Sequence, residues 1–277
     1  MIKMIENGAQ DEKLQGFKRS KDPVLGVYRS IFSAKTPVEG QDGGVVTSLL
    51  IKGLDEGRFD AVVVVKRTQG YNAQVIGCED RDEVLATKGT IYLKINVLSK
   101  LCELAKQGKR KIALTGTPCQ ARAARKTIQS LKQQFPDLEI TIIGLFCFEA
   151  FDAVKLKEET RRVLKTDLDK AERVQIYEGK CYVYVDNQKF SCKIQDLNQA
   201  VDKGCRFCGD FTAQFADISV GSVGSSRGFS TVIVRSVKGE ELLKGLDVIK
   251  AKTGREEIMK LAKFKTERAQ KQFDIKN

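Results

Sequence analysis

The chain has 277 residues, of which 42% are hydrophobic and 30% are charged, and its formal net charge is +12. This length and composition are ordinary for a globular protein with a substantial core. The chain contains no histidine, which excludes an imidazole as a general base, a zinc ligand or a member of a nucleophilic triad, so a metal centre would have to be all-thiolate or completed by oxygen.

The predicted elements begin after a polar, charged stretch. Residues 1–22 are predicted to form an N-terminal extension, and residues 23–277 a single unit. In chain order, the patterns predict strands at 24–28 and 30–33, a helix over 45–54, strands at 60–65 and 73–77, a helix over 96–107, a strand at 111–115, a helix over 119–131, a strand at 140–145 and a helix over 154–164. Strands that alternate with helices predict an α/β core with an at least partly parallel sheet.

The pattern changes after about residue 170. Short antiparallel strands are predicted at 173–177, 181–185 and 189–193, buried strands return at 215–221 and 230–236, and a charged helix over 256–273 ends the series. We therefore predict a mixed, partly parallel central sheet flanked by helices, with a small antiparallel, cysteine-bearing insert at 170–210 and a C-terminal helix.

Charge and hydropathy limit the setting in which the chain works. The basic segments lack interleaved aromatic residues and a recognisable nucleic-acid module, so we expect no nucleic-acid binding. No apolar run approaches the roughly 20 residues of a membrane span, and the first eight residues lack the apolar stretch of a secretory signal. We expect a cytoplasmic location, where eight cysteines indicate metal binding or redox chemistry rather than disulfides.

Four of the cysteines stand in contexts that suit a metal centre. Cys205 and Cys208 form a C-x-x-C pair, and Cys119 and Cys147 each follow a strand-like run. Four thiolates are what an iron–sulfur cluster or a structural zinc needs. A lone C-x-x-C pair can also be a redox dithiol, and a lone buried cysteine can be inert. The remaining cysteines have no such context and are expected to be structural; they are Cys78, Cys102, Cys181 and Cys192.

Three glycine-containing segments could contact a cofactor. Gln41–Gly44 opens a predicted helix, where backbone amides suit a pyrophosphate, although an ordinary N-cap explains it equally well. Gly116 and Thr117 lie between a strand and a helix, at the position where α/β sheets bind ligands. The loop Gly221–Ser225 suits a planar ring or a phosphate, and a plain turn is the alternative.

In this order, the motifs resemble the beta subunit of the coenzyme F420-reducing hydrogenases and the related formate dehydrogenase beta subunits. The resemblance runs from about Val24 to the final helix. It is carried by Gln41–Thr47, Thr117–Gln120, Leu145–Cys147, Gly204–Asp210, Ala216–Ser225 and Gly228–Ile233.

The resemblance implies a flavoprotein that holds FAD and one 4Fe–4S cluster and moves electrons between the cluster and the deazaflavin coenzyme F420. The positions that match cluster ligands are Cys119, Cys147, Cys205 and Cys208. The positions assigned to FAD are Gln41, Asp42, Gly43, Gly44, Val45, Thr47, Thr90, Gly116, Thr117, Gly221, Ser222, Val223, Gly224 and Ser225. The implied partners are subunits of a hydrogenase, formate dehydrogenase or heterodisulfide-reductase-type complex that carry further iron–sulfur clusters.

The chain departs from the family pattern in two places. Many members carry a ferredoxin-like segment of clustered cysteines, which this sequence lacks, so it resembles a bare flavin–cluster module. Members active with the deazaflavin often show Gly-Thr-Lys-Tyr where this chain has Gly89-Thr90-Ile91-Tyr92, and Lys88 could replace the missing lysine. Two alternatives stay open, namely the same module with another two-electron donor or acceptor, and a zinc-stabilised scaffold subunit without flavin.

Overall fold

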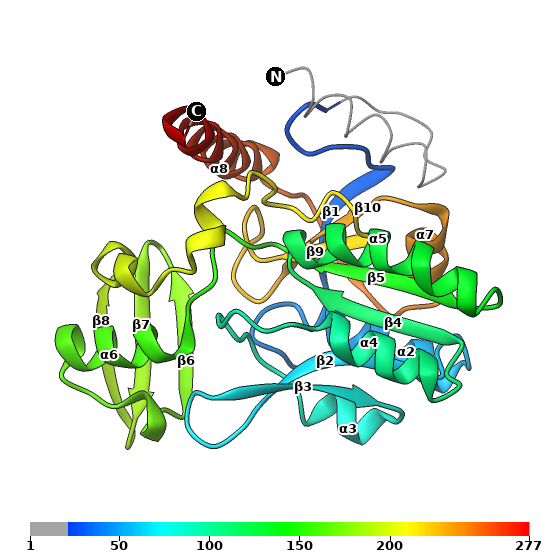
Figure 1. Ribbon diagram of the computed structural model, residues 1–277, viewed down its shortest axis with the longest axis horizontal. Coiled ribbons are helices and arrows are strands. Elements are labelled where there is room, and N and C mark those ends of the chain that lie inside the picture. The colour runs from blue at the N-terminus through cyan, green and yellow to red at the C-terminus, as the bar shows by residue number, and fades with distance from the viewer. Residues whose placement is uncertain (1–21, 277) are drawn as a thin grey trace.

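The computed structural model describes residues 22–276 (Figure 1). All but the last residue of the predicted extension over 1–22 therefore lies outside the described residues. Every helix within the described part of the chain is too short or too polar to span a bilayer.

A large mixed sheet forms the centre of the described chain. Its strands, in spatial order, are β11 (Ile249–Ala251), β1 (Ser30–Lys35), β10 (Ser230–Val234), β9 (Ile218–Gly221), β5 (Glu139–Leu145), β4 (Lys111–Gly116), β2 (Ala61–Arg67) and β3 (Ala73–Cys78). The adjacent strands β9, β5, β4 and β2 are parallel, and antiparallel pairs extend the sheet on both sides. The predicted mixed, partly parallel sheet is confirmed.

The strand directions define one functional edge. Because β1 and β9 are both antiparallel to β10, β1 runs in the same direction as β9, β5, β4 and β2. The carboxyl ends of these five strands therefore meet along one side of the sheet, which we call the C-terminal edge. Loops at this edge are where ligands bind in open α/β sheets.

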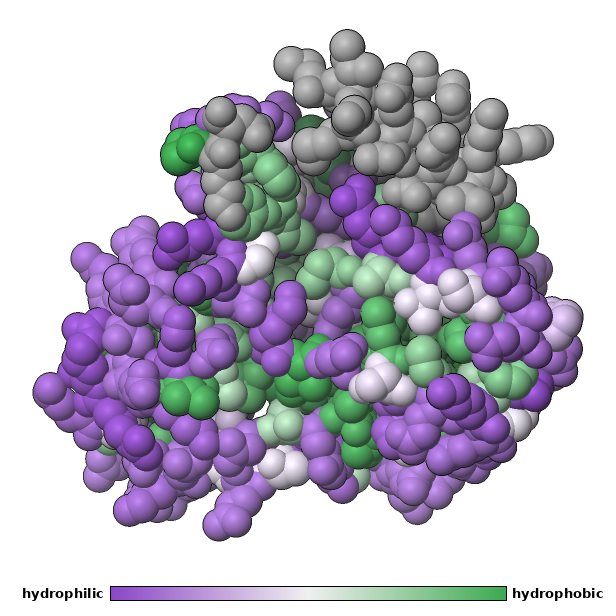
Figure 2. Space-filling model, in the orientation of Figure 1, coloured by the Kyte–Doolittle hydropathy of each residue, from purple (hydrophilic) through white to green (hydrophobic). Residues whose placement is uncertain are grey.

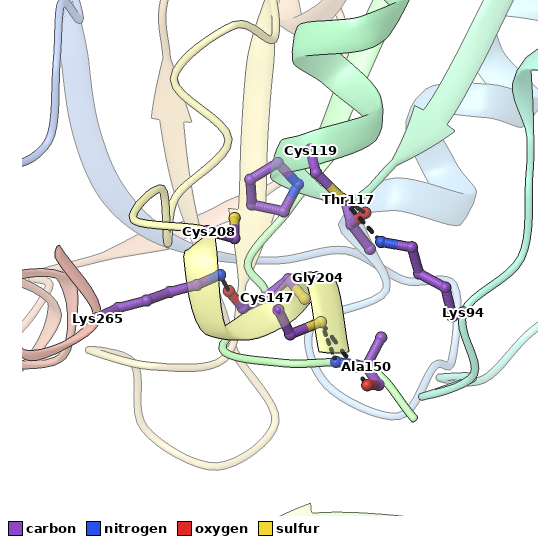
Figure 3. A pocket seen from close by; sticks show the side chains of 10 residues that line it. Lys94, Thr117, Cys119, Cys147, Ala150, Gly204, Cys208 and Lys265 are labelled. Atoms are coloured by element: carbon purple, nitrogen blue, oxygen red, sulfur yellow. Dashed lines mark hydrogen bonds between the residues drawn. The ribbon is translucent and has the colours of Figure 1, made fainter. Parts of the chain in front are cut away.

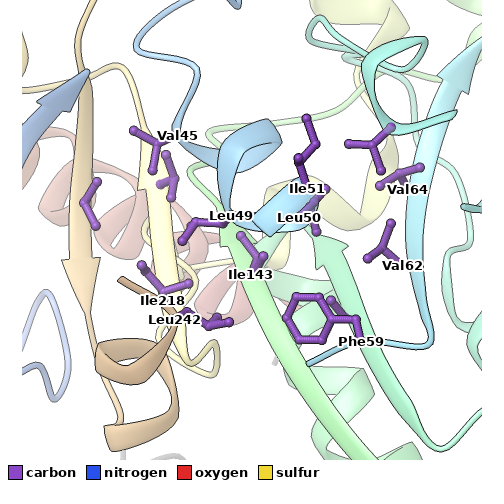
Figure 4. Packing of buried hydrophobic residues seen from close by; sticks show 14 of the residues in the cluster. Val45, Leu49, Leu50, Ile51, Phe59, Val62, Val64, Ile143, Ile218 and Leu242 are labelled. Carbon is purple, nitrogen blue, oxygen red and sulfur yellow. The ribbon is translucent and has the colours of Figure 1, made fainter. Parts of the chain in front are cut away.

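Helices cover both faces of the large sheet. One face packs against α2 (Val45–Asp55), α3 (Arg81–Leu85) and α7 (Val237–Leu243), and Figure 4 shows Leu49, Leu50 and Leu242 directed onto the strands. The other face packs against α4 (Leu98–Lys106) and α5 (Pro118–Gln134). The continuous apolar runs of β2, β4 and β5 follow from this burial on both faces.

A smaller part of the chain, built on a small antiparallel sheet, lies beside the large sheet (Figure 1). It consists of β6 (Arg173–Tyr177), β7 (Lys180–Val185) and β8 (Gln188–Lys193), with α6 (Ala153–Leu164), the 3-10 turns η1 (Leu168–Lys170) and η2 (Ile194–Ala200), and then η3 (Lys203–Phe207). It has an apolar cluster of its own, which includes Phe151, Leu156 and Val183. The predicted antiparallel insert is confirmed.

The C-terminal helix α8 (Arg255–Lys276) packs on the molecule along a narrow stripe. Its buried residues are Ile258, Ala262, Lys265 and Ala269, which recur at the spacing of one helix face. Ile258 and Ala262 join an apolar cluster with Leu25 and Phe211. The predicted C-terminal helix is thus confirmed.

Some predicted boundaries are wrong. The segment 24–28 is a turn and not a strand, because a carboxylate oxygen of Asp22 accepts hydrogen bonds from the amides of Val24 and Leu25. The predicted strand 215–221 begins only at Ile218, and 230–236 ends at Val234, where Arg235 turns away to bond the carbonyl of Asp217. The short elements α3, α7 and β11 were not predicted, since each gives too short a pattern to recognise.

Arg235 is a buried cation that holds several segments together. Its guanidinium donates to the carbonyls of Leu25 and Val27, to the carbonyl and hydroxyl of Thr212 and to the hydroxyl of Ser219, at 2.7–3.0 Å. The side chain is fully buried. A buried cation that satisfies this many acceptors cannot be removed without leaving them unpaired.

The substitution Arg235→Met is expected to lower the free energy of unfolding by about 3 kcal/mol or more, since buried acceptors lose their donor. The midpoint of urea unfolding measures this effect. Arg81→Met is the control, because Arg81 is exposed and its ion pair with Asp55 lies on the surface; a loss of at most about 0.5 kcal/mol is expected there. Equal midpoints for the two variants would contradict the structural role of Arg235.

Candidate metal centre

The four cysteines that the sequence analysis selected line one pocket. Cys119, Cys147, Cys205 and Cys208 surround a cavity of about 70 Å³ (Figure 3). A water molecule needs roughly 10–15 Å³ measured in this way, so the cavity has room for a group of several atoms. Segments separated by up to about 90 residues in sequence therefore converge on one centre.

Cys119 is positioned by the start of α5 at the C-terminal edge. Thr117 and Gln120 form a capping box, and Pro118 occupies the first helical position. The Cys119 sulfur consequently lies in the first helical turn, 3.3 Å from the Thr117 hydroxyl and 3.5 Å from the ammonium of Lys94. The Cys119 sulfur thus has a hydroxyl and a cation beside it.

Cys147 follows β5 at the same edge. Its amide donates to the carbonyl of Phe211, and its carbonyl accepts a hydrogen bond of 2.5 Å from the ammonium of Lys265. Burial raises the pKa of the Cys147 thiol to about 12, with Lys265 opposing this rise and the other pocket cysteines adding to it. Such a thiol stays protonated at neutral pH unless a bound cation replaces its proton.

Cys205 lies in the short turn η3, beyond the small sheet, and Cys208 is the C-cap of that turn. Asp202 caps this turn by accepting from the amide of Gly204. The sulfur of Cys205 accepts from the amide of Ala150 at 3.3 Å, and the thiol of Cys208 donates to the carbonyl of Asp210. Burial also raises the pKa of Cys205, although the Ala150 amide and Lys94 oppose this rise.

The spacing of the four sulfurs distinguishes two kinds of metal site. Within residues 22–276, no three cysteine or carboxylate side chains lie close enough together to share a single metal ion. All four cysteines nevertheless line the same cavity. This arrangement suits a centre that has several metal atoms.

Helix α8 fastens the cysteine-bearing loops to one another. In addition to Lys265, the Thr266 hydroxyl donates to the carbonyl of Gly209. Arg268 donates to the carbonyls of Phe148 and Cys205 and forms an ion pair with Glu149. Three side chains of one helix thus hold the Cys147 loop and the C-x-x-C turn in place.

Three cationic residues near the pocket were not predicted from the sequence, namely Lys94, Lys265 and Arg268. Lys265 does carry a sequence signal, because it shares a helix stripe with Ile258 and Ala262, and a lysine on an apolar stripe is unusual. Lys94 lies in a loop without periodicity, and Arg268 is one of many charged residues on α8. Neither has a comparable signal.

The Gln41 side chain joins two of the segments assigned to a flavin and also contacts Tyr92. The Gln41 side chain accepts from the amide of Thr90 and donates to the Tyr92 hydroxyl. That hydroxyl also accepts from the amide of Ile176, the fourth residue of β6. Gln41 and Thr90 are therefore neighbours, although 49 residues separate them in sequence.

Helix α2 begins directly after the Gln41 segment. Gly44 is its N-cap, in a left-handed conformation with φ of 70°, and a Cβ here would overlap the Val38 carbonyl. No side chain caps this end, and no acidic residue occupies the first turn, which contains Val45 and Thr47. Burial raises the pKa of the preceding Asp42. The first amides of α2 are thus open to an acceptor from outside the helix.

The other assigned segments also lie at the C-terminal edge. Gly116 ends β4 and leads through Thr117 into Cys119, and Gly221 ends β9 beside the ring of Phe146, the neighbour of Cys147. Gly43 is packed against backbone of β1 and β10. In the loop after Gly221, Ser222 is exposed, and Val223 packs in the apolar cluster under α8. The carbonyl of Gly224 accepts a hydrogen bond from the amide of Gly254. The Ser225 hydroxyl forms hydrogen bonds with the hydroxyls of Ser33 and Thr231.

The remaining cysteines lie away from this pocket. Cys78 is in the core of the large sheet, and Cys102 is on α4. Cys181 and Cys192 face each other across β7 and β8. None of the four lines the cavity, so their expected structural role stays a prediction consistent with these positions.

Two family models match the chain in succession. The model for the N-terminal part of the coenzyme F420 hydrogenase/dehydrogenase beta subunit matches residues 31–102, and the model for the C terminus of the same beta subunit matches residues 109–259. Together they include all four pocket cysteines and the segments at the C-terminal edge.

Relatives and a solved structure are similar over most of the chain. The coenzyme F420-dependent sulfite reductase of Methanocaldococcus jannaschii is 34% identical over 89% of the chain, and the coenzyme F420 hydrogenase subunit beta of Methanothermobacter thermautotrophicus is 32% identical over 80%. The chain spans 41% of the former protein and 82% of the latter. A chain of the F420-reducing nickel–iron hydrogenase complex from Methanosarcina barkeri superposes with a TM-score of 0.84 at 28% identity, covering 92% of this chain and 94% of that one.

The substitution Arg268→Met is expected to lower the free energy of unfolding by about 1–3 kcal/mol, because Glu149 and two carbonyls lose a charged donor. Hydrogen exchange is expected to speed up at the Cys147 loop and at the C-x-x-C turn. Lys271→Met, which removes an exposed charge from the same helix, is the control. Unchanged exchange at both loops in Arg268→Met would show that α8 does not hold them.

Proposed function

Because the chain belongs to the coenzyme F420 hydrogenase/dehydrogenase beta subunit family and is therefore an oxidoreductase subunit, we propose that it passes electrons between a deazaflavin hydride carrier, a bound FAD and one 4Fe–4S cluster. The observation that carries this proposal is the convergence of Cys119, Cys147, Cys205 and Cys208 on one cavity at the C-terminal edge.

The donor set fits an iron–sulfur cluster. Four thiols enclose a cavity with room for several atoms, and the described residues offer no single-ion site. Structural zinc requires ligands that all lie about 2.3 Å from the same ion, which this spacing does not favour. The ammonium groups of Lys94 and Lys265 border the cavity, which suits an anionic occupant. The zinc-scaffold alternative is thereby less well supported.

Features of the C-terminal edge support FAD. The uncapped start of α2 at Gly44 suits the pyrophosphate, and Gln41, Thr90, Gly116 and the Gly221–Ser225 loop lie along the same edge. Figure 2 shows apolar side chains gathered in the hollow between the two sheets, within a hydrophilic rim. A planar ring system needs such an apolar lining.

The cofactors would supply the redox chemistry, and the chain's residues would position them. When bound, the flavin supplies two-electron exchange with a hydride carrier, and the cluster supplies one-electron exchange with a partner. The residues of this chain bind and orient both groups. No histidine is required, since no protein base has to act at the cluster.

The partners are proposed from the same family membership. The relatives include subunits of a hydrogenase and a sulfite reductase more than twice as long as the matched region. We propose that the chain works in a complex whose other parts carry further iron–sulfur clusters, as in hydrogenases, formate dehydrogenases or heterodisulfide reductases. A different two-electron donor or acceptor remains the second candidate, favoured by Ile91 in place of the family's lysine.

Protein isolated without oxygen is expected to contain iron, sulfide and flavin. Cys147→Ala is expected to lose most of the iron and sulfide, because one of the four proposed cluster ligands is removed. Cys102→Ala is expected to retain them. Metal and sulfide assays with visible spectra measure this. Wild-type protein that is colourless and carries zinc would refute the cluster, and iron content unaffected by Cys147→Ala would refute the ligand assignment.

Reduced coenzyme F420 is expected to bleach the bound flavin. Lys88 is exposed, immediately before the Gly89-Thr90 turn. Lys88→Met is expected to raise the apparent KM for the anionic coenzyme about threefold to fivefold, since an exposed ion pair contributes up to about 1 kcal/mol. Lys106→Met on α4 should leave the KM unchanged. Bleaching by reduced nicotinamide, with none by reduced deazaflavin, would favour the second candidate.

A further inference from the structure

Lys265 carries a charge at a position that the fold buries. Its side chain is 1% exposed and shares the buried stripe of α8 with Ile258, Ala262 and Ala269. Removing an ammonium group from water is costly unless an opposite charge or several acceptors compensate it. A lysine in this position therefore requires compensation from its surroundings.

The described protein supplies little of this compensation. An ammonium has three hydrogens to donate, and within residues 22–276 the hydrogen-bond partner of Lys265 is the carbonyl of Cys147 alone. No carboxylate in that range lies within ion-pair distance of it. Asp210 is near enough to interact electrostatically with Lys265, but it forms no hydrogen bond with the Lys265 ammonium. One Asp210 oxygen accepts from the Gln214 amide, and the other has no hydrogen-bond partner within the described residues. Lys265 also lines the cysteine pocket.

A second lysine reaches the same pocket from the opposite side. Figure 3 shows Lys94 extending to Cys119 while Lys265 extends from α8 to the Cys147 loop. The ammonium of Lys94 lies 3.5 Å from the Cys119 sulfur. Two cations thus flank a cavity whose other lining groups include four thiols.

We propose that Lys265 and Lys94 are the counter-charges of the centre that the four cysteines bind, and that Lys265 raises its reduction potential. This inference rests on the proposed function, in which that centre is a 4Fe–4S cluster. A cluster with four thiolate ligands is anionic in both redox states. On reduction it accepts one electron from the flavin or from a partner's cluster, no bond forms or breaks, and its negative charge increases by one.

Electrostatics gives the direction of the effect. A fixed positive charge stabilises the more negative, reduced state more than the oxidised state, so it shifts the potential to a less negative value. The shift is larger for a charge held in the protein interior, because solvent and salt screen it less. Lys265 is buried, whereas Lys94 is more exposed, so Lys265 has the larger influence.

The test compares four variants of the full chain, prepared without oxygen. Lys265→Met removes the buried charge, Lys265→Arg retains it, and Lys94→Met removes the second charge. Lys263→Met is the matched control, because Lys263 is an exposed lysine on the same helix. The readouts are iron and sulfide per chain, and the cluster midpoint potential from a redox titration followed by electron paramagnetic resonance.

Lys265→Met is expected to shift the midpoint to a more negative potential, and Lys94→Met to shift it less in the same direction. Lys265→Arg and Lys263→Met should stay near the wild-type value. Midpoints of Lys265→Met and Lys94→Met that coincide with that of Lys263→Met, at full iron content, would overturn the inference. If Lys265→Met does not fold or load iron, the midpoint of Lys94→Met is compared with that of Lys263→Met, and equal midpoints would overturn the inference. Wild-type protein without iron and sulfide would overturn the proposed function, and this inference with it.

Discussion

Hydrogen bonds from α8 to the carbonyls of the cysteine-bearing loops are the constraint on which the candidate centre depends. Cys119 and Cys147 follow strands of the large sheet, whereas the C-x-x-C turn follows the small one. Lys265 and Arg268 join these parts by donating to Cys147 and Cys205 respectively. Together with Thr266, which donates to the carbonyl of Gly209, these side chains of α8 maintain a geometry that neither sheet produces by itself.

The sequence predicted those features that depend on periodicity and on short motifs. The β-branched runs identified the buried parallel strands, and because parallel strands end at one edge, Cys119 and Cys147 could be expected to lie together. The C-x-x-C pair could be recognised by its spacing. The small sheet and the terminal helix followed from the change of pattern after residue 170.

The features that were not predicted depend on contacts between distant segments. The turn at 24–28 has the composition of a strand, and the carboxylate of Asp22 is what redirects it. Nothing local shows that Lys94 reaches Cys119, or that Arg235 lies buried among carbonyls from two distant segments, Leu25–Val27 and Thr212. For Lys265, its place on the apolar stripe of α8 indicates that it is buried, but it does not indicate which group the ammonium contacts.

The hydroxyl of Tyr92 has a consequence for the proposed electron transfer. It bonds both Gln41, at the C-terminal edge, and β6 of the small sheet, while the backbone of Tyr92 bonds Phe151, four residues after Cys147. One phenol thus ties together the parts that would surround the two redox groups. For the electron transfer proposed above, we expect a scaffold braced in this way to rearrange little, which would keep the reorganisation energy of the transfer small.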